Sequence, residues 1–89
     1  MSEVLIIEIL KALGDKTRLD IVRKLAREER GASCSDVSTC SSLSQPAMSH
    51  HFSKLVEANV LTENKDGKEK IYQLNRELLQ ANGIDPDLL

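Results

Sequence analysis

The 89-residue sequence predicts one small, mainly α-helical domain with a single β-hairpin near its C-terminal end. Apolar residues recur at the 3.6-residue spacing of helices through most of residues 3–58. Over residues 60–74 the pattern changes to a period of two around an Asp66-Gly67 turn, which is typical of a hairpin. No linker, repeat or low-complexity tract divides residues 1–89, so we expect a single domain.

The composition is that of an ordinary globular domain, with 40% hydrophobic, 29% charged and only 2% aromatic residues, so the core has to be aliphatic. There is no apolar run of about 18 residues and no basic N-terminal region followed by a cleavage site. We therefore expect a cytoplasmic protein that makes no contact with a membrane. Two cysteines are too few for a disulfide framework and are expected to be thiols.

The first predicted helix, residues 1–14, is apolar on nearly every side and ends at Gly14. Only Glu3, Glu8 and Lys11 are left to face water. Such a helix needs two apolar surfaces to cover it. Its own domain supplies one, and the same helix of a second subunit is the simplest source of the other. A central buried helix in a monomer is the alternative.

Asp15 is expected to cap a second helix with a conventional apolar stripe, and Gly31 ends this segment. The polar side of this helix is basic. Its basic side chains either contact phosphate groups or simply face solvent on a surface helix. The second interpretation is favoured for each residue taken singly. These residues are Arg18, Arg23, Lys24 and Arg27.

Ser33 and Asp36 form a capping box for a short third helix over residues 33–42. A tight turn then leads into a long helix that runs from Ser44 toward Leu61. A short helix, a turn and a long helix over residues 33–58 are the order expected of a helix-turn-helix motif.

The long helix combines a cap, a buried stripe and an unusually light outer face. Ser44 is placed to cap it, and Met48, Phe52 and Leu55 fall on one apolar stripe. The outer face carries short polar side chains that permit close approach to base edges and phosphates. We therefore interpret this long helix as a DNA-recognition helix. The expected DNA contacts are Ser44, Gln45, Pro46, Ala47, Ser49, His50, Ser53 and Lys54.

The hairpin over residues 60–74 is the expected wing. Lys65, Lys68 and Lys70 cluster near its tip, where they can reach the DNA backbone, although three acidic residues lie between and beside them. A solvated hairpin of mixed charge is an equally good interpretation. A last short helix over residues 75–82 is capped by Asn75, and the chain is expected to trail off from Ile84.

The adjacent histidines point about 100° apart on a helix, so a shared metal ion is not expected. His51 lies at the edge of the apolar stripe and is interpreted as structural, whereas His50 faces outward with the DNA contacts. Cys34 falls in the first turn of the third helix, where the helix dipole lowers a thiol pKa, and this makes a redox switch one hypothesis. In the alternative, Cys34 is a bystander and Cys40 fills part of the core.

Three segments together resemble the ArsR/SmtB-type winged-helix repressors of prokaryotes: LGDKTRLDIVRKL, SQPAMSHHFSKLVEANVL and the hairpin ending IYQLNRELL. The resemblance implies a homodimeric repressor that binds operator DNA, usually under the control of a metal or another inducer. It places the dimer interface on helices 1–14 and 75–82. Both metal sites known in the family lack their ligand pattern here, so neither a metal nor another cofactor is expected. The candidate interface residues are Val4, Leu5, Ile6, Ile9, Leu78 and Leu79.

The sequence therefore predicts a winged helix-turn-helix regulator, most simply a homodimeric repressor of an inverted-repeat operator in double-stranded DNA. No nucleophile motif or phosphate-binding loop indicates an enzyme. The net charge of −2, with four basic and four acidic residues from Ser44 to Tyr72, keeps a protein-binding winged-helix module open. A redox- or ligand-sensing repressor using Cys34 is a further alternative, and the inducer stays open.

Overall fold

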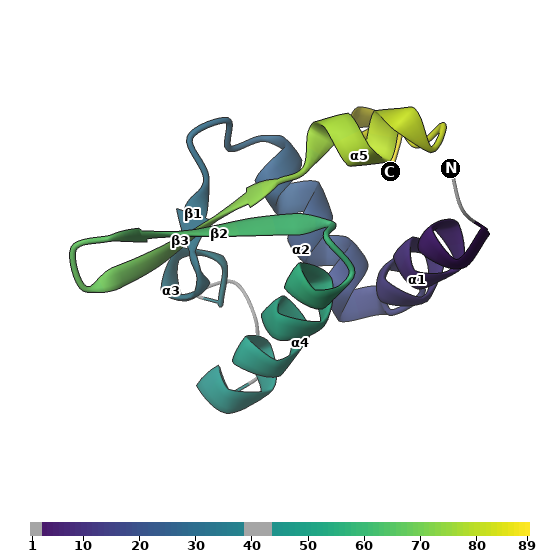
Figure 1. The fold of residues 1–89 in the computed structure, drawn as a ribbon. Helices are drawn as coiled ribbons and strands as arrows, with labels where there is room; N and C mark the ends of the chain where they lie inside the picture. The colour runs from purple at the N-terminus through teal and green to yellow at the C-terminus, as the bar shows by residue number, and fades with distance from the viewer. Residues whose placement is uncertain (1–2, 39–43) are drawn as a thin grey trace.

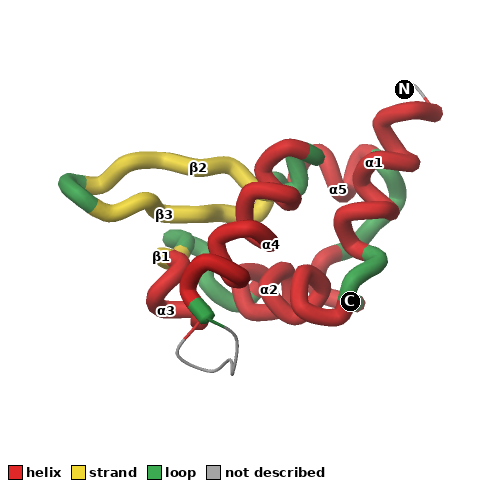
Figure 2. Tube along the Cα trace, turned by 90° about the horizontal axis from the view of Figure 1, so that it is seen from below, coloured by secondary structure: helices red, strands yellow, loops and turns green. Residues whose placement is uncertain are grey.

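The computed structural model describes residues 3–38 and 44–89 and confirms a mainly helical domain with a small antiparallel sheet (Figure 1). Its elements in chain order are α1 (Glu3–Leu13), α2 (Lys16–Ala26), β1 (Ala32–Ser33), α3 (Cys34–Ser38), α4 (Gln45–Glu57), β2 (Leu61–Asp66), β3 (Glu69–Leu74), α5 (Arg76–Ala81) and the 3-10 helix η1 (Pro86–Leu88). The hairpin extends away from the helices, and α1 lies at the other end of the molecule (Figures 1 and 2).

The sheet has three strands in the order β1-β3-β2, one more than the sequence predicts. The additional strand β1 is only two residues long, and its Ala32 pairs with Tyr72 of β3. In the hairpin, Asp66 pairs with Glu69, so the two-residue loop is Gly67-Lys68 and lies one residue later than expected. Gly67 has a positive φ of 64°, which glycine adopts without steric cost in such a loop.

The predicted helix starts are confirmed by side-chain caps. Asp15, Ser44 and Asn75 each accept a hydrogen bond from the backbone amide three residues later, at 3.0, 3.4 and 3.3 Å respectively. Ser33 and Asp36 form the reciprocal capping box, because each accepts a bond from the other's backbone amide at 3.1 Å. The local signals in the sequence therefore place these helix starts correctly.

The core joins α4 to the sheet and to the first two helices. Met48, Phe52 and Leu55 of α4 are buried, as the stripe predicts, and the Phe52 ring lies 4.5 Å from the Tyr72 ring of β3. Aliphatic side chains supply most of the remainder, including Ile9, Ile21, Val22, Leu25, Val37, Val60, Leu61 and Leu79. The recognition helix is thus fixed by its inner face, and its outer face stays available.

The C-terminal residues do not trail off as expected. Asp85 caps η1, Pro86 is buried, and η1 packs against α2 and α5. Arg23 of α2 donates from Nε to the carbonyl oxygen of Leu89 at 2.8 Å. A proline after a short helix indicated a chain end in the sequence, whereas here it starts a helical turn that packs on the domain.

Gly31 and Gly83 both have a positive φ, but only Gly31 is tightly surrounded, so the pair allows a controlled test of stability. Gly31 has a φ of +86°, and an added Cβ would lie 2.7 Å from the Tyr72 carbonyl oxygen, whereas Gly83 has a φ of +77° with open space around it. We expect Gly83→Ala to lower the free energy of unfolding by about 1 kcal/mol, and Gly31→Ala by roughly 3 kcal/mol because it adds a clash. Urea unfolding of both variants checks this. Equal losses would show that the contact with β3 does not matter.

Candidate nucleic-acid interface

The outer face of α4 is open to solvent along its length. Gln45, Pro46, Ser49, His50, Ser53 and Lys54 are all exposed, Ser44 before them is exposed as well, and Ala47 is half-buried. The buried stripe on the opposite side holds this face in place. The structure therefore brings together, on one surface of one helix, the residues that the sequence assigns to DNA contact.

The start of α4 is held against α3. The Cys34 thiol of α3 donates to Oε1 of Gln45 at 3.8 Å, while the Ser44 hydroxyl caps the first turn. Pro46 lies in that turn, where an N–H has no helical partner to lose. The first residues of α4 are thus positioned by the preceding helix as well as by their own cap.

The wing separates its charges between the two faces of the sheet. Lys65 and Lys70 pair across the hairpin, and successive residues alternate between faces, so both lie on the face of Tyr72, which packs against α4. Asp66 and Glu69 pair with each other on the opposite face. The acidic residues that dilute the lysines in the sequence are therefore largely turned away from the α4 side.

Some positive charge remains uncompensated at the tip of the wing. Nζ of Lys70 lies 3.6 Å from Oε1 of Glu63, but Lys65 and Lys68 form no ion pair with any residue that the structure describes. Two lysines directly opposite each other repel, and an anion nearby relieves this repulsion. Glu63 is such an anion beside Lys70, and a DNA phosphate would be another for Lys65 and Lys68.

Most of the basic residues of α2 bond to backbone carbonyl groups of other elements, a role that neither of the two interpretations from the sequence includes. Arg18, Arg23 and Lys24 each donate to a backbone carbonyl oxygen, those of Ala12, Leu89 and Val37, at 2.7, 2.8 and 3.3 Å. Arg27 is exposed. These contacts hold α1, α3 and the C-terminus onto α2, so the cations of α2 contribute little to a DNA surface.

The two histidines differ as predicted. His50 is exposed on the outer face, whereas His51 is half-buried and its Nδ1 lies 3.3 Å from Nη1 of Arg18. The Asp15 carboxylate is also near, with Oδ2 at 3.7 Å from the same nitrogen. His51 is therefore a structural histidine that links α4 to the start of α2.

The pKa of the Cys34 thiol differs from the sequence-based expectation. Burial raises the pKa of its thiol, and the opposing effect of a hydrogen bond from Ser49 is smaller. The expected lowering by the helix dipole is therefore wrong, because α3 is only five residues long and the thiol is partly covered. A raised pKa leaves less thiolate at neutral pH and weakens the redox-switch hypothesis. Cys40 lies outside the described residues.

The apolar surface of α1 also differs from the expected interface. Ile9 and Leu79 are 0% exposed in the protomer's own core, so neither is available to a second subunit. Leu5, Ile6 and Leu78 are partly buried, and the side chain of Val4 lies outside the described residues. The large exposed apolar residues of α1 are instead Ile7 and Leu10, at 43% and 55%.

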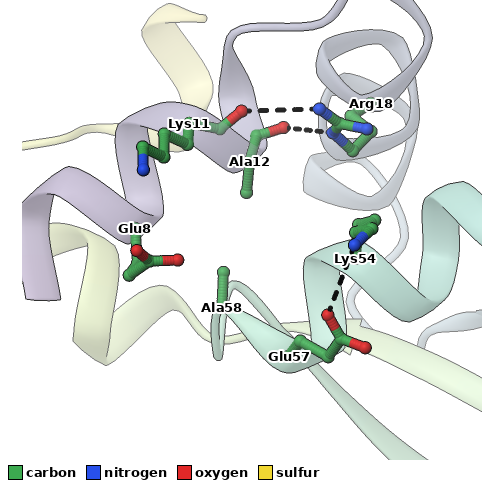
Figure 3. Close-up of a pocket in the computed structure, with 7 residues that line it drawn as sticks. All are labelled: Glu8, Lys11, Ala12, Arg18, Lys54, Glu57 and Ala58. Atoms are coloured by element: carbon green, nitrogen blue, oxygen red, sulfur yellow. Dashed lines mark hydrogen bonds and ion pairs between the residues drawn. The ribbon is translucent and has the colours of Figure 1, made fainter.

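A cleft of about 300 Å³ separates α1 from the C-terminal half of α4 (Figure 3). The methyl groups of Ala12 and Ala58 face each other across it, and charged side chains surround them. Nζ of Lys54 lies 3.9 Å from Oε2 of Glu57 at its edge. The lining residues are Glu8, Lys11, Ala12, Arg18, Lys54, Glu57 and Ala58.

Within residues 3–38 and 44–89, no three or more His, Cys, Asp or Glu side chains are grouped so that they could hold a metal ion. No helix in these ranges has the length and apolar character needed to span a membrane.

A short helix, a long helix with an exposed polar face and a hairpin with three lysines are the parts that define the winged helix-turn-helix class of DNA-binding proteins. A model for a helix-turn-helix domain matches residues 13–64. An arsenical resistance operon repressor from Staphylococcus xylosus is 38% identical over 86 residues, which cover 91% of this chain and 76% of the relative. The chain belongs to the ArsR/SmtB-type family of transcriptional regulators.

Solved structures agree with this assignment. The fold matches a crystal structure of an ArsR family transcriptional regulator with a TM-score of 0.82, at 20% identity, over 93% of this chain and 84% of the other. The transcriptional repressor PagR of Bacillus anthracis matches with a TM-score of 0.76, at 25% identity, over 89% and 88% of the two chains. The family and the fold are those of DNA-binding transcriptional regulators, not of enzymes.

Proposed function

We propose that the chain acts in the cytoplasm as a homodimeric transcriptional repressor that binds an inverted-repeat operator. The observation that supports this most strongly is the outer face of α4, which is exposed, rich in short polar side chains, and fixed from behind by Met48, Phe52 and Leu55. A helix held in this way can enter the major groove without losing its contacts to the core.

Each part of the surface has a role in this proposal. The base edges are contacted by Gln45, Ser49, His50 and Ser53, with Pro46 and Ala47 packed beside them. Ser44 and the first-turn amides of α4 bind a phosphate, since a helix N-terminus favours anions. The remaining backbone contacts come from Lys54, Lys65, Lys68 and Lys70. Gln45 is the main candidate for reading adenine, because its amide can bond to N6 and N7 together.

The second subunit packs against α1. Ile7 and Leu10 are three residues apart and lie on one side of the helix, and a two-fold contact would cover them in both subunits. Ile6 is partly buried and lies next to Leu10 around the helix, whereas Leu5 and Leu78 pack against the protomer's own core. A symmetric pair then presents two α4 helices to half-sites about one helical turn, roughly 34 Å, apart.

Two substitutions test the proposed contacts on a duplex that the wild-type protein enriches from random DNA. Gln45→Ala should cost about 1–3 kcal/mol at one base pair, because it removes a base contact. Lys68→Ala should weaken binding to all sequences alike and lower the salt slope by about 1, because it removes a phosphate contact. Fluorescence anisotropy at several salt concentrations measures both.

Lys16→Ala is the matched control, because Lys16 is an exposed lysine on α2 whose ion pair within the described residues is with Asp20 on its own helix. It should leave both the affinity and the salt slope unchanged. A uniform loss across operator variants for Gln45→Ala would contradict its role in reading bases. An effect of Lys16→Ala equal to that of Lys68→Ala would contradict the wing contact.

A further inference from the structure

One side chain connects the end of α1 to the recognition helix. The Arg18 guanidinium donates from Nε to the carbonyl oxygen of Ala12 at 2.7 Å and from Nη2 to that of Lys11 at 3.5 Å (Figure 3). These carbonyls lie in the last turn of α1, where helical partners are missing and a cation is favoured. The remaining nitrogen, Nη1, lies 3.3 Å from Nδ1 of His51 on α4.

This contact assigns roles to the two side chains. A guanidinium has donors only, so Nδ1 of His51 accepts wherever Arg18 bonds to it. Asp15 lies near the same atom, because its Oδ2 is 3.7 Å from Nδ1. The pKa of Asp15 is lowered, chiefly by the hydrogen bond from the Arg18 amide. The contact between Arg18 and His51 therefore needs an accepting atom at the position of Nδ1.

We propose that Arg18 is a positioning residue for operator recognition, which holds α4 to α1 through its contact with Nδ1 of His51. The inference rests on the proposed function, in which α1 forms the dimer contact and α4 reads the DNA. In a symmetric dimer, the link between these two helices sets the distance and angle between the two copies of α4. Arg18 thus acts on DNA binding without contacting DNA.

Several other charged groups lie near His51 and Arg18. Arg18 and Asp15 face it from the start of α2, and His50 on α4 lies with its ring centroid 6.0 Å away. Lys11 and Glu8 of α1 and Lys54 and Glu57 of α4 line the cleft that Arg18 also borders.

Substitutions at both ends of the link test the proposal on the duplex enriched from random DNA. Arg18→Ala and His51→Leu should each weaken binding by about tenfold, a typical size for coupling between two sites. His51→Asn should bind like the wild type, because its Oδ1 can take the place of the accepting Nδ1. Arg27→Ala, which removes an exposed arginine from the end of α2, should have no such effect. Circular dichroism and thermal unfolding establish which variants are folded.

One readout separates positioning from a general loss of structure. His51→Leu should tolerate duplexes whose half-site spacing is changed by one base pair better than the wild type does. His51→Asn should keep the wild-type spacing preference, because its Oδ1 keeps an accepting atom in place.

A folded His51→Leu variant with wild-type affinity and wild-type spacing preference would overturn the role of Arg18. A folded His51→Asn variant that loses as much affinity as His51→Leu would overturn the requirement for an accepting atom at this position. If instead the wild-type protein enriched no duplex at all, the proposed function itself would fail, and this outcome is distinguishable from the other two.

Discussion

Leu10→Glu is expected to convert the protein into a monomer and to weaken operator binding by about 100-fold or more, because linked binding modules gain roughly 10²- to 10⁴-fold from acting together. Leu10 is 55% exposed, so the protomer itself loses little packing. In the proposed dimer the same position is covered, and an unpaired carboxylate there is strongly unfavourable. The loss should therefore appear in assembly and in DNA binding, with the fold retained.

Sedimentation equilibrium measures the assembly, and anisotropy with the enriched duplex measures the affinity. Leu88→Glu is the matched control, because it places the same carboxylate at another exposed leucine, which is 83% exposed in η1 and lies outside the Ile7 and Leu10 surface of α1. It should remain dimeric. A Leu10→Glu protein that stays dimeric, or a monomer with undiminished affinity for both half-sites, would contradict the proposed interface.

Phe52→Ala is expected to lower the free energy of unfolding by about 3–5 kcal/mol, which is a large share of the roughly 5–15 kcal/mol typical of a folded domain. Phe52 is 0% exposed, and its ring lies 4.5 Å from that of Tyr72. Few other aromatic side chains exist in this sequence to fill the space. The contact between α4 and the sheet should be lost together with overall stability.

Urea unfolding followed by circular dichroism checks this value. Ser53→Ala is the control, since Ser53 is the neighbouring residue but is exposed, and surface changes of this kind usually stay within about 0.5 kcal/mol. A loss below about 1 kcal/mol for Phe52→Ala would show that the space under α4 closes easily, and that the ring does not fix the helix on the sheet.

Local signals in the sequence predicted the helix starts and the inner face of α4. A cap needs only a side chain and an amide three residues later, and a buried stripe needs only the helical period, so Asp15, Ser44 and Phe52 could be placed from sequence alone. Strand β1 could not be placed, because two residues are too few to show alternation and its pairing with Tyr72 is nonlocal.

The interface residues were harder to predict for a physical reason. When a helix is apolar on nearly every side, its pattern does not say which side faces its own core, so Ile9 was expected outside and Leu10 was not singled out. Cys34 shows a different limit, because the helix dipole is visible in the sequence but the burial that outweighs it is not. The link from Arg18 to His51 spans 33 residues, and no local pattern indicates it.

In the proposed function, the two α4 helices of a dimer contact one face of the same duplex. Changing the half-site spacing tests this arrangement most directly. Inserting about five base pairs, half a helical turn, between the half-sites moves one of them to the opposite face of the DNA. We predict that this insertion reduces the affinity of the wild-type protein to that for a single half-site. Unchanged affinity after the insertion would contradict a fixed dimer that reads both half-sites together.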